Sequence, residues 1–156
     1  MPVVERASDL AADADAVWAW VTTAAGVNDE LRPWMRMTVP RGWKDGSLGT
    51  VEPGVPIGRS WILFLGVIPF DADDLTIAEL GPRHFVERSP LFSAASWQHE
   101  RAVTPTASGC RLVDRLTFES RPLTARIPGG VQLHRAVIAA IFRHRHRRLV
   151  RRFGAG

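Results

Sequence analysis

The densest group of chemically capable side chains comprises Trp97, His99 and Arg101, two residues apart, together with Asp114 further along the chain. Residues two apart on a β-strand lie on the same face of a sheet. A histidine beside a carboxylate is suited to general acid–base chemistry or to orienting the polar end of a ligand. The carboxylate would favour the charged imidazole, whereas burial would oppose it.

The pairing of the two strands that carry these residues decides whether they meet. If the turn between the strands pairs Val103 with Cys110, then His99 lies opposite Asp114. The apolar alternation of the second strand indicates that this shared face points inward. A slip of one residue would reverse the faces. The inward residues would then be Gln98, Glu100 and Ala102.

Three roles stay open for the pair of His99 and Asp114. It can act as an acid–base pair, it can orient a ligand, or it can form with Arg101 a structural group that fixes the register of the sheet. The sequence alone does not choose among these roles.

Length and composition predict a single domain over residues 1–156. The chain is 46% hydrophobic, which is ordinary for a globular protein. Its longest apolar run, Trp61–Phe70, has ten residues, whereas a membrane-spanning helix needs about 20. The only cysteine is Cys110, so no intramolecular disulfide is possible. These features predict a cytoplasmic protein.

The positive charge is concentrated at one end of the chain. Six arginines lie between Arg143 and Arg152, and without them the net charge of +4 becomes −2. This basic end predicts either binding to an anionic surface, such as weak contact with a membrane or with nucleic acid, or a solvated helix end whose cations interact with the helix dipole. We expect no specific nucleic-acid partner. The oligomeric state is left open.

Hydrophobic periodicity predicts an α+β protein. Two short helices follow a first strand, and Asp13 is suited to cap the first helix. Gly26 is suited to end that helix, and Pro33 to end the second. A run without helix breakers from Val131 to about Arg152 predicts a helix of roughly 33 Å. The predicted strands are 3–10, 34–39, 59–67, 71–80, 84–89, 91–104 and 110–120.

Other candidate sites find little support. Asp71, Asp73 and Asp74 lack the oxygen-ligand pattern of a calcium loop and are interpreted as a polar strand start. His144 and His146, two apart on a helix, diverge too far to share a metal. We therefore expect no metal and no cofactor. The Gly- and Pro-rich segment 41–58 is either an entrance loop or a surface excursion.

Several motifs together resemble one superfamily. They are Val4-Glu5-Arg6 followed by Ala16-Val17-Trp18, then Phe85–Ser89, Trp97–Arg101 and Asp114–Glu119. In this order the chain is similar, over nearly its whole length, to the START/Bet v 1-like superfamily, often labelled SRPBCC or polyketide cyclase/dehydrase-like. The resemblance implies a helix-grip fold: a curved antiparallel sheet of six to seven strands around a long C-terminal helix.

The resemblance also implies a cavity for a lipid, polyketide or other hydrophobic ligand between sheet and helix. We expect a carrier or sensor; the alternative is a cyclase or dehydratase that uses His99 and Asp114 as acid and base. The ligand itself is not indicated. The expected ligand contacts are Trp34, Met37, Trp61, Leu63, Phe85, Trp97, His99, Arg101, Asp114, Leu116, Phe118, Leu133, Val137 and Ile141.

Overall fold

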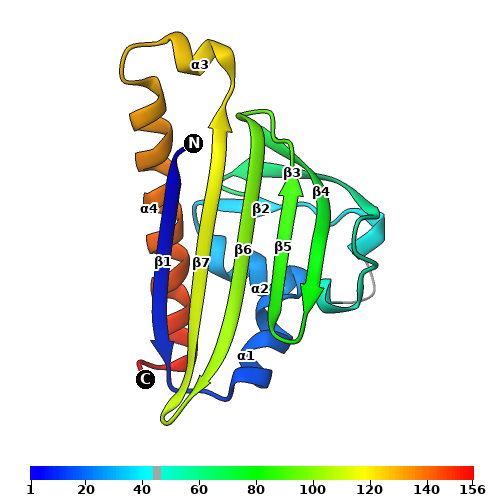
Figure 1. The fold of residues 1–156 in the computed structure, drawn as a ribbon, viewed down its shortest axis with the longest axis vertical. Helices are drawn as coiled ribbons and strands as arrows, with labels where there is room; N and C mark the ends of the chain where they lie inside the picture. The colour runs from blue at the N-terminus through cyan, green and yellow to red at the C-terminus, as the bar shows by residue number, and fades with distance from the viewer. Residues whose placement is uncertain (44–46) are drawn as a thin grey trace.

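A seven-stranded antiparallel sheet curls around one long helix in the computed structural model, which describes residues 1–43 and 47–156 (Figure 1). The strand order is β1-β7-β6-β5-β4-β3-β2, a meander whose last strand returns beside the first. The predicted helix-grip architecture is confirmed. The strands are β1 Val3–Leu10, β2 Met35–Met37, β3 Pro56–Phe64, β4 Ile68–Gly81, β5 His84–Ser89, β6 Ala94–Thr106 and β7 Gly109–Ser120.

Two short helices follow β1, as expected. Asp13 caps helix α1 (Ala14–Val21) by accepting from the amides of Asp15 and Ala16. The role predicted for Gly26 is wrong, because this residue lies inside helix α2 (Ala24–Leu31). The Oγ1 atom of Thr23 caps α2 by accepting from the Gly26 amide at 3.0 Å. A Cβ atom at Gly26 would lie 2.0 Å from the Trp20 carbonyl, so this contact requires glycine.

The remaining elements close the fold. Helix α4, Gly130–Phe153, matches the predicted long helix and packs against β1 and α2. A short helix, α3 (Pro122–Arg126), precedes it and was not predicted. Two 3-10 turns, η1 (Arg41–Trp43) and η2 (Leu48–Thr50), lie in the predicted segment 41–58. Residues 44–46 of that segment lie outside the described residues.

The β6–β7 hairpin has a register two residues away from the predicted one. Pro105, not Val103, lies opposite Cys110, so that Arg101 is the residue opposite Asp114. The strands pair further than expected, up to a two-residue turn at the tip of the hairpin. Because side chains alternate with period two, a shift of two residues keeps the same faces. The side chains expected to face inward therefore still do.

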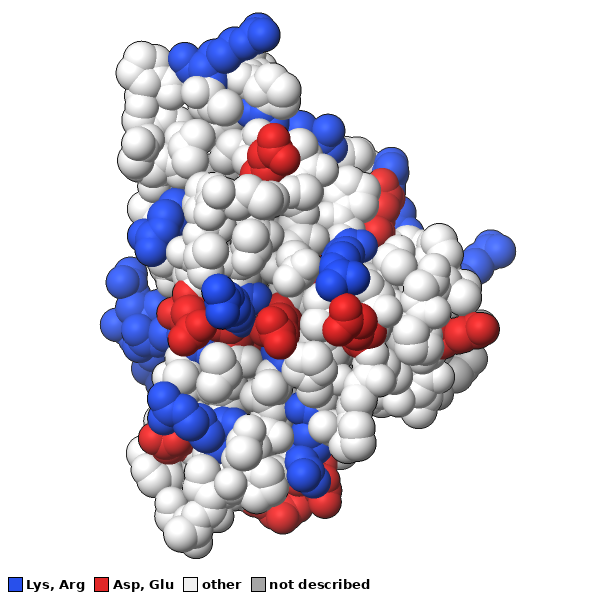
Figure 2. All heavy atoms as spheres, in the orientation of Figure 1, with Lys and Arg blue, Asp and Glu red and all other residues white. Residues whose placement is uncertain are grey.

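The two faces of the sheet differ in polarity. The inner face packs against helices through three buried apolar clusters. The outer face carries basic and acidic side chains close together (Figure 2), such as the ion pair of Arg88 with Glu79. This face shows charges of both signs. Among the described residues, no helix is both long and apolar enough to cross a membrane.

Candidate functional site

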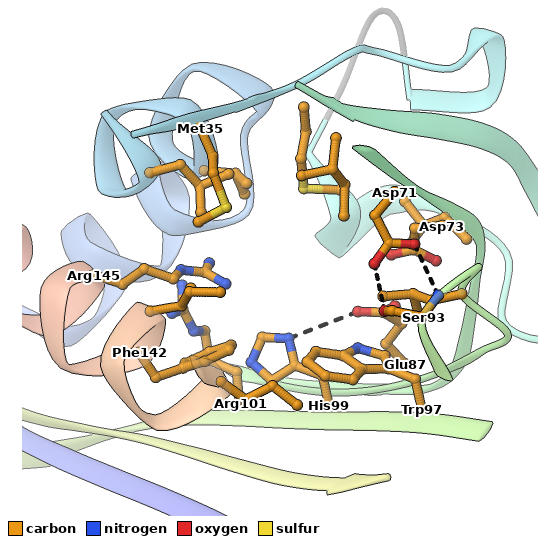
Figure 3. A pocket seen from close by; sticks show the side chains of 18 of the residues that line it. Met35, Asp71, Asp73, Glu87, Ser93, Trp97, His99, Arg101, Phe142 and Arg145 are labelled. Atoms are coloured by element: carbon orange, nitrogen blue, oxygen red, sulfur yellow. Dashed lines mark hydrogen bonds and ion pairs between the residues drawn. The ribbon is translucent and has the colours of Figure 1, made fainter. Parts of the chain in front are cut away.

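A cavity of about 240 Å³ lies between the inner face of the sheet and helix α4, with α2 and the two 3-10 turns at its side. Figure 3 shows that Asp71, Asp73 and Glu87 lie on one side of the cavity and that Arg101 and Arg145 lie on the other. The lining residues are Val21, Val27, Leu31, Met35, Met37, Trp43, Leu48, Ile62, Phe70, Asp71, Asp73, Leu75, Phe85, Glu87, Leu91, Ser93, Trp97, His99, Arg101, His134, Val137, Ile138, Ile141, Phe142 and Arg145.

Arg101 stands at the centre of a buried ion network on one wall of the cavity. Its guanidinium donates to both oxygens of Asp114, each at 2.7 Å, and to both oxygens of Glu30, at 2.7 and 3.1 Å. Arg145 on α4 donates to Glu30 at 2.7 Å. Bidentate pairs of this kind are the strong form of a charged hydrogen bond. The network therefore joins α2, β6, β7 and α4.

The pKa values of the two acids in this network follow from their partners. Burial alone would raise the pKa of Asp114, but the charge and hydrogen bonds of Arg101 and the charge of His99 hold it well below its usual range. For Glu30, the charges of Arg101 and Arg145 outweigh burial in the same way and lower the pKa. Both acids are therefore ionised partners of the two arginines.

His99 connects this network to the cavity. Its Nε2 atom donates to Asp114 Oδ1 at 2.7 Å, and its Nδ1 atom lies 3.6 Å from Glu87 Oε2. Burial lowers the pKa of His99, but the charge and hydrogen bond of Asp114 outweigh it and leave the pKa raised. The imidazole ring packs edge-on against Phe85 and Phe142. His99 is therefore held in place on both sides.

Three acidic residues gather at the opposite end of the cavity, on strands β4 and β5. Asp71 accepts from the amide of Ser93 at 3.1 Å and from its hydroxyl. Burial, followed by the charge of Glu87, raises the pKa of Asp73 to about 10. Asp73 is only 4% exposed and Glu87 only 6%. At neutral pH, Asp73 is therefore a protonated acid beside Glu87.

The structure places half of the predicted ligand contacts in the cavity wall. Whether a ligand contacts them stays a prediction. These residues are Met37, Phe85, Trp97, His99, Arg101, Val137 and Ile141.

Three other predicted contacts lie beneath the cavity rather than in its wall. Asp114, Leu116 and Phe118 have no exposed surface. They are on the predicted face of β7, but α4 covers this part of the sheet. Ile138 and Phe142 pack against Leu116 and Phe118. The expected direct contact of Asp114 with a ligand is therefore wrong.

Asp114 is sealed by its hydrogen bonds as well as by burial. Its Oδ2 atom accepts from His146 Nε2 at 2.8 Å, in addition to its bonds with Arg101 and His99. The Nδ1 atom of His146 is in turn bonded to the Ser8 hydroxyl at 2.8 Å. Asp114 therefore accepts hydrogen bonds from Arg101, His99 and His146 and holds these three side chains in position.

The remaining predicted contacts do not line the cavity. Trp34 is 54% exposed, Trp61 is 41% exposed and Leu133 is 67% exposed. On β3 the inward residue is Ile62, and its neighbours Trp61 and Leu63 lie outside the lining. A register irregularity between Ile62 and Leu63 disturbs the simple alternation that the sequence suggested. Leu133 lies one helical turn before Val137 and is exposed, although the next residue, His134, lines the cavity.

Several residues of the site were not predicted from the sequence, although the alternation of residues along the strands indicates most of them. Asp71 and Asp73 alternate with Leu75 on β4, a pattern that places all three on the inner face. Glu87 is two residues from Phe85 in the same way. Trp43 lies in the segment 41–58, which was predicted to be an entrance loop or a surface excursion; it is 4% exposed and donates from Nε1 to the Thr22 carbonyl.

The C-terminal arginines do not form one exposed patch. Arg145 is buried in the ion network, Arg148 donates to Asp29, and Arg152 stacks on Trp20 at 3.5 Å from the ring centroid. Three exposed arginines recur every fourth residue and so form one stripe along α4: Arg143, Arg147 and Arg151. Contact of this stripe with an anionic membrane stays a prediction.

Sequence comparison assigns a family. Residues 8–153 match the model of a domain of unknown function, DUF8410. The chain belongs to the DUF8410 family. No curated protein matches it in sequence.

Solved structures show which fold this DUF8410 domain shares. Protein CV1439 from Chromobacterium violaceum has a TM-score of 0.73 at 12% identity, over 100% of both chains. A START superfamily protein from Mycobacterium smegmatis has a TM-score of 0.68 at 12% identity, over 97% of this chain and 96% of that one. DynU16, from the dynemicin biosynthetic locus, has a TM-score of 0.60 at 18% identity, over 96% of this chain and 46% of that one. The predicted START/Bet v 1-like fold is confirmed.

Proposed function

We propose that this DUF8410 domain binds a small, mainly apolar molecule in the cavity between α4 and the sheet, as a carrier or sensor. The cavity itself is the observation that carries this proposal. Most of its lining residues are apolar, and its polar groups gather at two places. Ligand pockets commonly combine an apolar lining with a few placed polar groups.

The size of the cavity limits the ligand. A cavity of about 150 Å³ in another protein stays dry and accepts benzene. The cavity here, at about 240 Å³, is therefore suited to a molecule with two fused rings or a short acyl chain. Larger ligands would require the side chains at the mouth to move.

The fold supports the same proposal. START-like folds are in general small-molecule-binding folds, and one solved neighbour comes from a biosynthetic locus. Because one fold serves many activities, we rest the proposal on the cavity and use the fold as support. A cyclase or dehydratase that uses Asp114 on its substrate has less support, since Asp114 has no exposed surface.

The proposal is tested by titration of 1-naphthylmethanol, a neutral two-ring probe, in a calorimeter. We expect saturable one-to-one binding. The variant Val137→Trp puts a large ring at a residue of the cavity wall that is 48% exposed. The added ring would compete with the probe for space at the cavity mouth and weaken binding about tenfold or more.

Leu133→Trp is the matched control for this experiment. It adds the same side chain to the same helix, one turn away and outside the cavity, at a residue that is 67% exposed. We expect the control to bind the probe like the original protein. No saturable binding, or equal binding by both variants, would refute the proposal.

A further inference from the structure

The acidic end of the cavity holds hydrogen-bond acceptors without donors. Asp73 and Glu87 are both more than nine-tenths buried, and both line the cavity. In the described part of the chain, neither Asp73 Oδ1 nor Glu87 Oε1 has a hydrogen-bond partner. Buried polar atoms are nearly always bonded, because an unmet group costs free energy. Apart from the one proton that Asp73 can share with Glu87, these oxygens meet no donor of the described residues, so a ligand that brings several donors would bond to both.

The nearby cations are already engaged. Both arginines of the cavity wall are bonded to Glu30, and Arg101 also to Asp114, so two cations face two acids there. Two histidines also line the cavity. His134 interacts with the charge of Asp71, but its Nδ1 atom is bonded to the Ser120 hydroxyl at 2.7 Å and burial lowers its pKa. The short hydrogen bond of His99, 2.7 Å, goes to Asp114. The distance from His99 to Glu87, 3.6 Å, is too long for a hydrogen bond.

The acidic end consequently has more acid than base. Asp71, Asp73 and Glu87 lie together on neighbouring strands, as Figure 3 shows, with Ser93 bonded to Asp71. Protonation of Asp73 removes its negative charge, whereas the carboxyl oxygens of Asp71 and Glu87 can still accept hydrogen bonds. In an apolar cavity, where charges are poorly screened, a cation at this end would be strongly favoured.

We infer that the cavity takes an apolar molecule that carries a protonated amine, with the ammonium group at Asp73 and Glu87 and the apolar body against Trp97 and Phe142. This inference rests on the proposed binding function and specifies its ligand. An ammonium group offers donors and no acceptor, which matches the two unpartnered oxygens. A hydroxyl group would meet only one of them, and a carboxylate would be repelled.

The test compares three probes with the same ring system: 1-naphthylmethylamine, 1-naphthylmethanol and 1-naphthylacetate. Calorimetry at neutral pH gives the dissociation constant of each. Hydrogen bonds to charged groups are stronger than neutral ones, so we expect the amine to bind about tenfold to a hundredfold more tightly than the alcohol. The acetate should bind most weakly.

Two variants locate the preference. Glu87→Gln removes the acid that the ammonium group would face, so it should reduce the ratio of alcohol to amine dissociation constants towards one. Asp73→Asn imitates the protonated acid and should keep more of this preference. Asp74→Asn is the matched control: it removes the same group from the next residue, which lies on the outer face and pairs with Arg59 at 2.7 Å. The control should keep the full preference.

The outcomes separate this inference from the proposed function. Equal binding of amine and alcohol, tighter binding of the acetate, or a full preference for the amine in Glu87→Gln would overturn the inference. In each of those cases the alcohol still binds and the proposed function stands. Failure of all three probes to bind would overturn both.

Discussion

Replacing Asp73 by asparagine should stabilise the protein at neutral and alkaline pH. Burial and the charge of Glu87 raise the pKa of Asp73 to about 10, whereas an unfolded chain has an aspartate pKa near 3.9. Between these values the folded state holds a proton that the unfolded state has lost. Stability from this residue is therefore fully present below about pH 4 and is lost as the pH rises towards 10. Asparagine imitates the protonated acid at every pH.

One bound proton sets the size of the effect. A difference of one proton changes the free energy of unfolding by about 1.4 kcal/mol per pH unit. From pH 6 to pH 8, the variant should therefore gain up to about 2.7 kcal/mol relative to the original protein. For a chain of this length, the Tm of the variant relative to that of the original protein should therefore rise by roughly 5–11 °C between pH 6 and pH 8.

Urea unfolding at pH 6, 7, 8 and 9 measures this effect for the original protein, Asp73→Asn and Asp74→Asn. Comparing free energies at each pH removes the contribution of the titrating groups that do not interact with Asp73. The Arg59 hydrogen bond lowers the pKa of Asp74, which stays ionised over this range, so its variant should show no widening difference. A constant difference between Asp73→Asn and the original protein would show that Asp73 is not held protonated.

Two further predictions concern the ion network and His99. Arg101→Met leaves two buried acids without their main partner and should cost about 3–5 kcal/mol of unfolding free energy, whereas Arg111→Met, which breaks an exposed pair, should cost less than about 1 kcal/mol. Similar losses in both variants, measured by urea unfolding, would argue against a buried network. His99→Ala should weaken binding of 1-naphthylmethanol about threefold to tenfold. Unchanged affinity in a folded variant would rule out a role for His99 in binding.

The sequence was sufficient for the elements whose patterns are strong. The predicted bounds of β1 and β5 match the structure, and nearly the whole of α4 follows from a long run without helix breakers. The inward face of β6 and β7 was also predictable, because strict alternation survives a two-residue error in register. On β3, the irregularity beside Ile62 was not visible in the sequence, and two residues were assigned to the wrong place.

The chemistry of the site was harder to predict, because buried charges meet only in the folded chain. Glu30 reaches Arg101 across 71 residues, and Arg145 reaches Glu30 across 115. The spacing of Val27, Glu30 and Leu31 places Glu30 on the buried face of α2. No pattern near Glu30 in the sequence indicates which residue it will pair with. Asp73 was interpreted as part of a polar strand start, since an acid that stays protonated is recognisable only from its surroundings.

The most direct test of the cavity as the binding site uses the protein labelled with 5-fluorotryptophan. Of the six tryptophans, Trp43 and Trp97 line the cavity, whereas Trp34 and Trp61 are exposed outside it. Single Trp→Phe variants assign the fluorine resonances. On saturation with 1-naphthylmethanol, we expect the resonances of Trp43 and Trp97 to shift and those of Trp34 and Trp61 to stay. Shifts confined to Trp34 and Trp61 would contradict binding between α4 and the sheet.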